Sequence, residues 1–166
     1  MIRTAILTVS DADPRAEQVE LSVKEIRSLL AKGPFTEVDY QQVLVEQAII
    51  RSKLRLWADG DEVDLILTIG GTGLGQRERT PEATLQVIER PVPGIADLIR
   101  LSGLKRGPEA VLSRAVAGVR RQTLIVNLPG SAEAARESLK AIFRILPEAI
   151  DTIVGERRSA LEAWPS

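Results

Sequence analysis

The feature that most restricts the fold of this chain is a short apolar segment followed at once by a cluster of glycines. Residues 65–69 read Leu-Ile-Leu-Thr-Ile, without a charge, which is typical of a β-strand buried on both faces. Four glycines then follow within six positions, at Gly70, Gly71, Gly73 and Gly75. Because glycine adopts positive φ and has no Cβ, such a loop lets a ligand approach the main-chain N–H groups closely. The pattern predicts a strand that ends in a ligand-binding loop at one edge of a sheet.

A helix start follows these glycines. Thr80 is a good N-cap residue, Pro81 suits the first helical position, and Glu82 lies in the first turn, where the helix dipole favours negative charge. A strand, a glycine loop and a capped helix together predict a corner that binds an anion. Neither familiar phosphate motif fits, because Gln76 and Arg77 replace the Lys and Ser or Thr of a P-loop and the third glycine of a dinucleotide-binding loop is missing. A tight turn without a ligand is the alternative, although it rarely needs so many glycines.

Composition limits the chemistry that this corner can support. The 166 residues include no cysteine and no histidine, which excludes disulfides, thiolate metal sites and the usual general base. Chemistry must then use carboxylates, hydroxyls, Lys, Arg, Tyr or main chain, and an oxygen-bound cation is the expected kind of metal. A net charge of -1 argues against a general nucleic-acid or membrane-surface binder. The 44% hydrophobic content supports one domain, and the lack of a signal-like or membrane-length apolar run predicts a cytoplasmic protein.

The chain alternates between strand-like and helix-like patterns. The expected strands are rich in β-branched or apolar residues and lie at residues 4–9, 37–44, 65–69 and 123–127. The expected helices have apolar residues at helical spacing and lie at residues 19–32, 50–60, 80 onward, 95–101 and 131–146. Ser131 is expected to cap the last of these helices.

This alternation predicts a three-layer α/β fold with a mostly parallel sheet and helices on both faces. A hairpin around Arg121 is expected to turn the segment at residues 113–119 back into the strand at 123–127, which adds one antiparallel strand. From Pro147 a short helix and a frayed tail are expected, so that residues 1–155 form the domain and residues 156–166 the tail.

Three loops that are far apart in the sequence should meet in such a fold. Ligands of parallel sheets bind outside the carboxyl ends of the strands. That rule brings together residues 10–14, 70–80 and 127–131. Each loop offers small residues, main-chain donors or hydroxyls, and the first two also carry carboxylates. We therefore expect one site built from all three.

Several sequence blocks lie in or near these loops. They are Thr68-Ile69-Gly70-Gly71-Thr72-Gly73, Arg79-Thr80-Pro81-Glu82-Ala83, Leu112-Ser113-Arg114 with Ala117-Gly118, and Asn127-Leu128-Pro129-Gly130-Ser131. In order and approximate spacing, over nearly the whole chain, these blocks resemble the MoaB/Mog family of molybdenum cofactor biosynthesis proteins. The resemblance implies a molybdopterin-binding α/β domain, also found as the G domain of gephyrin, that assembles as a trimer or a dimer of trimers. It also implies transfer of AMP from Mg²⁺-bound ATP to the terminal phosphate of molybdopterin, with release of pyrophosphate.

The resemblance also implies roles for individual residues by motif position. The nucleotide and phosphate cradle would consist of Gly70, Gly71, Thr72 and Gly73. Asp11 and Glu78 would be the catalytic residues, and Glu78 the magnesium ligand. The implied pterin-binding residues are Ser10, Ser113, Asn127, Pro129, Gly130 and Ser131.

Several of these residues also have a purely structural interpretation. Ser10 and Asp11 could simply end a strand, Ser131 could only cap a helix, and Asn127 could only satisfy backbone groups. The sequence by itself leaves both interpretations open.

The chain departs from the family pattern at two acidic positions. Glu78 stands where catalytic members usually carry Asp in the glycine loop, and Val45 stands where they usually carry another Asp before a helix start. Glu78 keeps the charge one methylene farther out, whereas Val45 cannot bind a metal, and Glu46, Asp11 or Asp13 could replace it. Two functions therefore stay open: an adenylyltransferase with altered metal ligation, and a molybdopterin-binding or scaffold member that does not transfer AMP.

Overall fold

The computed structural model describes residues 1–13 and 15–162, of which residues 156–162 are described by backbone only. Six strands form one sheet in the order β2-β1-β3-β6-β5-β4. They are β1 (Ile2–Val9), β2 (Phe35–Val43), β3 (Leu65–Ile69), β4 (Arg90–Pro91), β5 (Ala117–Arg120) and β6 (Thr123–Leu128). All four predicted strands are confirmed, with ends within two residues of the predicted ones. Pro14 and the end of the predicted tail, residues 163–166, lie outside the described residues.

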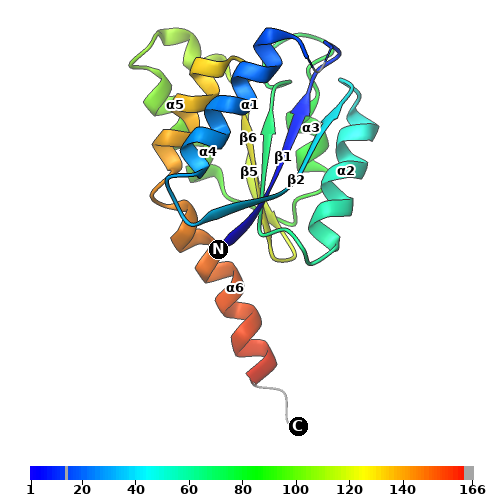
Figure 1. Ribbon diagram of the computed structural model, residues 1–166, viewed down its shortest axis with the longest axis vertical. Coiled ribbons are helices and arrows are strands. Elements are labelled where there is room, and N and C mark those ends of the chain that lie inside the picture. Colours follow the sequence, from blue (N-terminus) through cyan, green and yellow to red (C-terminus); the bar gives the residue numbers. More distant parts are fainter. Residues whose placement is uncertain (14, 163–166) are drawn as a thin grey trace.

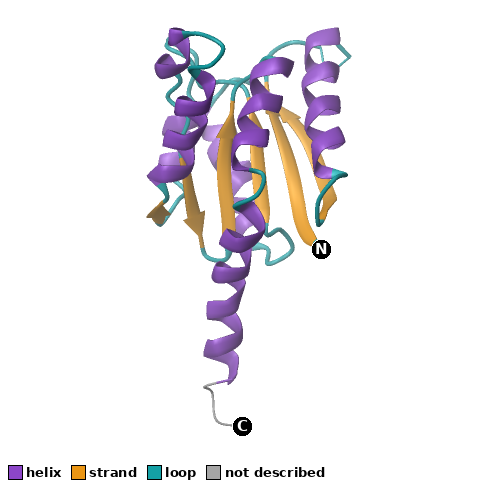
Figure 2. Ribbon diagram, turned by 90° about the vertical axis from the view of Figure 1, so that its left-hand side faces the viewer, coloured by secondary structure: helices purple, strands orange, loops and turns teal. Residues whose placement is uncertain are grey.

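The sheet is mostly parallel. β1 pairs in parallel with β2 and β3, and β3 pairs in parallel with β6. β5 alone runs against its neighbours, since it is antiparallel to both β6 and β4 (Figure 2). The predicted hairpin at Arg121, which has a φ of 50°, creates this reversal. The predicted α/β fold with one antiparallel strand is confirmed.

Helices cover both faces of the sheet and make the fold three-layered (Figure 1). On one face lie α1 (Glu17–Leu30), α4 (Pro93–Gly103) and α5 (Ala132–Ile142). On the other face lie α2 (Gln47–Asp59) and α3 (Thr80–Leu85). A short 3-10 helix, η1 (Pro108–Leu112), follows α4, and α6 (Leu146–Glu162) extends beyond the end of the sheet where β1 begins.

The central strand β3 shows why its sequence carries no charge. Leu65, Leu67 and Ile69 contribute to the core cluster under α1, α4 and α5, whereas Ile66 contributes to the cluster under α2 and α3. Successive side chains of a strand point to opposite faces, and helices cover both faces here. A charge at any of these positions would be buried without water.

The boundary between the last two predicted helices lies earlier than expected. α5 ends at Ile142, and Leu146, which was expected to end the same helix, instead begins α6. Leu146 and Ile150 are buried in the core on the side of α5, so the stripe continues across the break. The helix predicted to be short is 17 residues long and reaches Glu162.

One predicted helix cap is correct and one is wrong. Ser131 caps α5, because its Oγ accepts a hydrogen bond from the N–H of Ala134 at 3.2 Å. Thr80 does not cap α3 but is its first residue. The Thr80 hydroxyl instead donates to the carbonyl of Gly70 at 2.9 Å, which ties the helix to the loop before it.

Within the described part of the chain, every helix is too short or too polar to cross a membrane. The carboxyl ends of β1, β3 and β6 lie at one edge of the sheet, at the end opposite to α6 (Figures 1 and 2).

An ion pair at the other end of the sheet should matter for stability. Asp64, whose side chain is 12% exposed, accepts three hydrogen bonds from Arg3 at 2.7 to 3.1 Å. We expect Asp64→Asn to lower the free energy of unfolding by about 2 kcal/mol, because Arg3 would lose its buried partner. Urea unfolding monitored by circular dichroism measures this, and Asp61→Asn nearby is the matched control.

The loss should also depend on pH. Burial alone raises the pKa of the Asp64 carboxyl, but the hydrogen bonds from Arg3 outweigh it and keep this pKa below its ordinary value of 3.8. Its contribution to stability is then fully present above about pH 4 and is lost as the pH falls through the lowered pKa. The two proteins should therefore approach the same free energy of unfolding in stronger acid. An unchanged difference between them there would contradict this account.

Candidate functional site

Loops that are distant in the sequence meet at the carboxyl ends of β1, β3 and β6. We call the loop after β3, residues 70–79, the glycine loop. The N–H of Gly70 donates to the carbonyl of Leu128 at 3.0 Å, and a Cβ on Gly130 would lie 3.4 Å from the Cα of Gly70. The loops after β3 and β6 are therefore in direct contact, as the parallel topology predicts.

The first two glycines of the glycine loop have backbone conformations that other residues rarely adopt. Gly70 has a φ of +100° and Gly71 a φ of +74°. A Cβ on Gly70 would lie 2.7 Å from the carbonyl oxygen of Val9, and one on Gly71 would lie 2.2 Å from Oγ1 of Thr80. Both glycines are required by the turn itself and by the close approach of β1 and α3. A larger residue at Gly71 would thus disturb the loop as well as any ligand.

The carboxylate of Glu78 folds back onto the glycine loop. Its two oxygens accept hydrogen bonds from the N–H groups of Gly73, at 3.0 Å, and Gly75, at 2.8 Å. Among the described residues, the N–H groups of Gly71 and Thr72 have no acceptor. The Gly71 donor is available to an anion, whereas the N–H groups of Gly70 and Gly73 are already used inside the protein.

Asp11 connects the loop after β1 to two other parts of the site. Its carboxylate accepts a hydrogen bond from the main-chain N–H of Val45 at 2.9 Å and forms an ion pair with Arg77 of the glycine loop. These contacts, led by the Val45 hydrogen bond, hold the pKa of Asp11 below its ordinary value. The carboxylate is therefore charged at neutral pH, and it links the two walls of the site.

A cavity of about 500 Å³ lies between these loops, and we call it the glycine-loop pocket. Its volume is in the range of small-molecule sites, which is about 300–1,000 Å³. Val45 contributes to its wall beside Asp11. The predicted site residues that line it are Ser10, Asp11, Gly70, Gly71, Glu78, Gly130 and Ser131. Ser10, which was predicted on the pterin side, thus lies with the nucleotide candidates.

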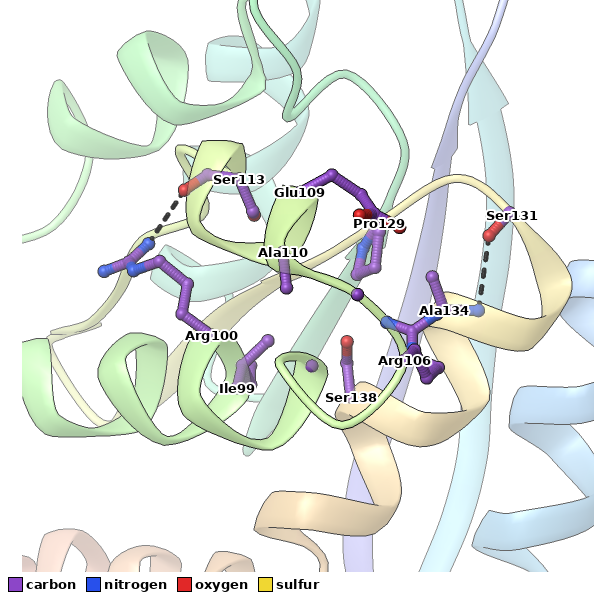
Figure 3. A pocket seen from close by; sticks show the side chains of 12 residues that line it. Ile99, Arg100, Arg106, Glu109, Ala110, Ser113, Pro129, Ser131, Ala134 and Ser138 are labelled. Atoms are coloured by element: carbon purple, nitrogen blue, oxygen red, sulfur yellow. Dashed lines mark hydrogen bonds between the residues drawn. The ribbon is translucent and has the colours of Figure 1, made fainter.

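A second cavity of about 310 Å³ lies between α4, η1 and α5, and we call it the α4–α5 pocket (Figure 3). The predicted residues Ser113, Pro129 and Ser131 line it, and Arg106 adds a positive charge. Arg100 holds Ser113 in place by donating to its carbonyl at 3.1 Å. Because Ser131 lines both cavities, ligands in the two pockets would lie next to each other.

Comparisons with known proteins agree with this architecture. Residues 5–148 match the family model described as "probable molybdopterin binding domain". The crystal structure of MoaB from Thermus thermophilus is 53% identical to the chain and superposes with a TM-score of 0.87, covering 93% of this chain and 98% of that one. The chain belongs to the MoaB/Mog family.

Other relatives include proteins named after an activity. A molybdopterin adenylyltransferase of Helicobacter pylori is 38% identical over 93% of this chain and 89% of its own length. One from Escherichia coli is 34% identical over 85% of this chain and 73% of its own length. The Mog protein of Mycobacterium ulcerans is 36% identical, with a TM-score of 0.83 and coverage of 92% of this chain and 99% of that one.

In this MoaB/Mog chain, Asn127 lies outside both pockets. Its side chain is 0% exposed and lines neither pocket. The amide is fully used, because its oxygen accepts from the N–H of Val116 at 3.1 Å and its nitrogen donates to the hydroxyls of Thr68 and Thr84 at 3.0 Å each. These contacts give Asn127 a structural role, because it joins β3, α3 and the residue before β5, whereas the pterin-binding role stays a prediction.

Two cradle residues also lie behind the pocket wall. Thr72 is 5% exposed, and neither Thr72 nor Gly73 lines the glycine-loop pocket. The carbonyls of Thr72 and Gly73 accept hydrogen bonds from Arg114, at 2.9 and 2.8 Å. The sequence pattern assigns no role to Arg114, although this residue lies inside a block that resembles the MoaB/Mog family.

The acidic residues of this site have the right chemistry for a nucleotide-bound Mg²⁺. Mg²⁺ usually takes one or two carboxylates from the protein and completes its shell with phosphates and water. Asp11 and Glu78 both line the glycine-loop pocket, and carboxylate oxygens that accept one N–H still have a free lone pair. Among the described residues, no three acidic side chains gather into a metal site of their own. Asp11 and Glu78 therefore suit a metal ion that is also bound by the phosphates of a ligand.

Proposed function

We propose that this chain acts in molybdenum cofactor biosynthesis by transferring AMP from ATP to the terminal phosphate of molybdopterin, with release of pyrophosphate. The observation that carries the proposal is the pair of adjacent cavities that share Ser131. Adenylyl transfer needs two phosphorylated substrates held side by side, and two pockets with a common wall provide that arrangement. The relatives named molybdopterin adenylyltransferase support the choice of substrates.

In this proposal ATP binds in the glycine-loop pocket. The free N–H group of Gly71 donates to its phosphates, and Ser10 and Gly130 also line this pocket. Molybdopterin binds in the α4–α5 pocket against Ser113 and Pro129, with its terminal phosphate directed toward the glycine-loop pocket.

The proposed reaction is an in-line displacement at phosphorus. An ionised oxygen of the molybdopterin phosphate attacks the α-phosphorus of ATP. The new P–O bond forms as the bond to the β-phosphate oxygen breaks, and its electron pair leaves with pyrophosphate. No residue has to remove a proton, which suits a chain without histidine. The protein contributes positioning, and the N–H group of Gly71 neutralises part of the phosphate charge.

We assign Glu78 and Asp11 as the residues that would hold Mg²⁺ together with the ATP phosphates. When bound, Mg²⁺ neutralises charge on the phosphates and on the leaving pyrophosphate. Arg77, which pairs with Asp11, keeps that carboxylate at the pocket wall before the nucleotide binds.

A molybdopterin-binding or scaffold protein without AMP transfer is the second candidate. Two observations favour it: Val45 offers no ligand beside Asp11, and both acidic residues of the site already accept hydrogen bonds from the protein. Pyrophosphate release measured with ATP, Mg²⁺ and molybdopterin separates the candidates. Adenylyl transfer predicts pyrophosphate that requires all three components, whereas molybdopterin binding without pyrophosphate would support the scaffold role.

We further propose that the chain assembles as a homo-oligomer, a trimer or a dimer of trimers. Support comes from exposed apolar residues concentrated on α4 and η1, which are the kind of surface that a partner covers. They are Leu98, Leu101, Leu104, Val111 and Leu112, with exposures from 37% to 63%. Light scattering of the purified protein should give a trimer mass or a multiple of it, and a single monomer mass would contradict this proposal.

We also propose that the protein is cytoplasmic. A cytoplasmic location, with no nucleic-acid or membrane partner, is consistent with the balanced charge of the chain and with substrates that are small phosphorylated molecules. Cell fractionation with an antibody against the natural chain tests the location directly.

A further inference from the structure

We propose that Arg114 is a positioning residue that sets the shape of the glycine loop for nucleotide binding. The proposal rests on the proposed function in one respect, the assignment of the nucleotide to the glycine-loop pocket. The contacts that carry it are independent of that assignment.

Arg114 joins several points of the glycine loop from one side. Its Nε donates to the carbonyl of Gly73 at 2.8 Å, and one terminal nitrogen donates to the carbonyl of Glu78 at 2.7 Å. Its main-chain N–H donates to the carbonyl of Thr72 at 2.9 Å. One residue therefore holds both the early and the late part of the loop.

The fourth contact fixes the guanidinium itself. The other terminal nitrogen of Arg114 forms an ion pair with Glu82 in the first turn of α3. Burial raises the pKa of Glu82, but the hydrogen bond from Arg114 outweighs it and leaves the pKa below its ordinary value. Glu82 is thus charged at neutral pH. Its second oxygen is buried without a hydrogen-bond partner, and among the described residues Arg114 is the cation that forms an ion pair with this carboxylate.

Arg114 and Glu78 complement each other on the same loop. Glu78 accepts N–H groups of the loop, from Gly73 and Gly75, whereas Arg114 binds carbonyls, from Gly73 and Glu78. With these groups paired inside the protein, the N–H of Gly71 stays unpaired in the part of the glycine loop that lines the pocket. A loop held in this shape presents donors rather than carbonyl oxygens to a phosphate and loses little entropy on binding.

The geometry needs a guanidinium rather than a generic positive charge. Arginine presents several N–H groups in one rigid plane, while lysine offers a single nitrogen. Three acceptors in different residues, Gly73, Glu78 and Glu82, cannot all be reached by one ammonium group with the same loop shape. The conservative variant Arg114→Lys keeps the positive charge but cannot make all the hydrogen bonds to Gly73, Glu78 and Glu82.

The chain offers a matched control in Arg120. Its guanidinium also bridges a carboxylate, that of Asp59, and a main-chain carbonyl, that of Val87 at 3.0 Å. Arg120 lines neither the glycine-loop pocket nor the α4–α5 pocket. A loss caused only by removing a structural arginine should therefore affect Arg114→Lys and Arg120→Lys alike.

The experiment measures three quantities in the full natural chain, in Arg114→Lys and in Arg120→Lys. These are amide hydrogen exchange of Gly73 and Gly75, Kd for Mg²⁺-ATP and Kd for molybdopterin, the last two by titration calorimetry. For Arg114→Lys we expect faster exchange in the loop and about tenfold weaker ATP binding, with molybdopterin binding within about twofold of the natural chain. For Arg120→Lys we expect all three to stay as in the natural chain.

The outcomes separate this proposal from the proposed function. Loop exchange unchanged in Arg114→Lys, or equal weakening of ATP and molybdopterin, would overturn the positioning role. If the natural chain binds no ATP, the proposed function fails, and the exchange measurement still decides whether Arg114 sets the loop.

Discussion

We expect Glu78→Ala to lower kcat/KM for AMP transfer by roughly two to three orders of magnitude. Two effects act together. The loop loses the acceptor of the Gly73 and Gly75 N–H groups, and the pocket loses a carboxylate assigned to Mg²⁺. Steady-state pyrophosphate release measures the effect, and thermal melting shows whether the variant is folded.

Glu78→Gln separates these two effects. Glutamine keeps one oxygen that can accept an N–H group of the loop, but it carries no charge for a metal. If charge is what matters, Glu78→Gln should be nearly as inactive as Glu78→Ala. Glu62→Ala, an exposed acidic residue that lines neither pocket, serves as the control and should leave activity unchanged. Activity of Glu78→Ala equal to that of the control would remove Glu78 from the reaction.

The second large effect expected is a gain. Val45 lines the glycine-loop pocket, and its N–H donates to Asp11, so an Asp at this position would place a second carboxylate beside the first. We expect Val45→Asp to raise Mg²⁺-dependent AMP transfer by about tenfold, which corresponds to about 1.4 kcal/mol. Kinetics at several Mg²⁺ concentrations should show that Val45→Asp reaches half-maximal activity at a lower Mg²⁺ concentration than the natural chain.

Val45→Asn is the matched control, because asparagine has similar size without the charge, and it should help much less. Both variants should melt slightly below the natural chain, since Val45 packs against the core under α2. Adding Glu78→Asp to Val45→Asp should not increase the gain, because a side chain shorter by one methylene cannot keep both the Gly73 and the Gly75 hydrogen bonds. Val45→Asp with no more activity than Val45→Asn would show that residue 45 does not limit the reaction.

The elements of the fold were predictable because their signals are local. β3 carries no charge because both of its faces are buried. α1 buries one face, so its apolar residues Val19, Val23, Ile26 and Leu30 recur every three or four positions. Helix ends were less predictable. Leu146 continues the buried stripe of α5 from a new helix, and a stripe shows which side is buried but not where the backbone turns.

The sequence by itself determined the α/β order of elements, the family resemblance and a chemistry without histidine or cysteine. The resemblance, together with small residues and carboxylates after buried strands, also pointed to residues that line the two pockets, and their roles stay predictions. The contacts of Asn127, Glu78 and Arg114 were decided only by the tertiary structure. Asn127 bonds Thr68, 59 positions away, and Arg114 bonds Gly73, 41 positions away. A polar side chain binds whichever groups packing brings within about 3 Å, and no period or motif in the sequence encodes that distance.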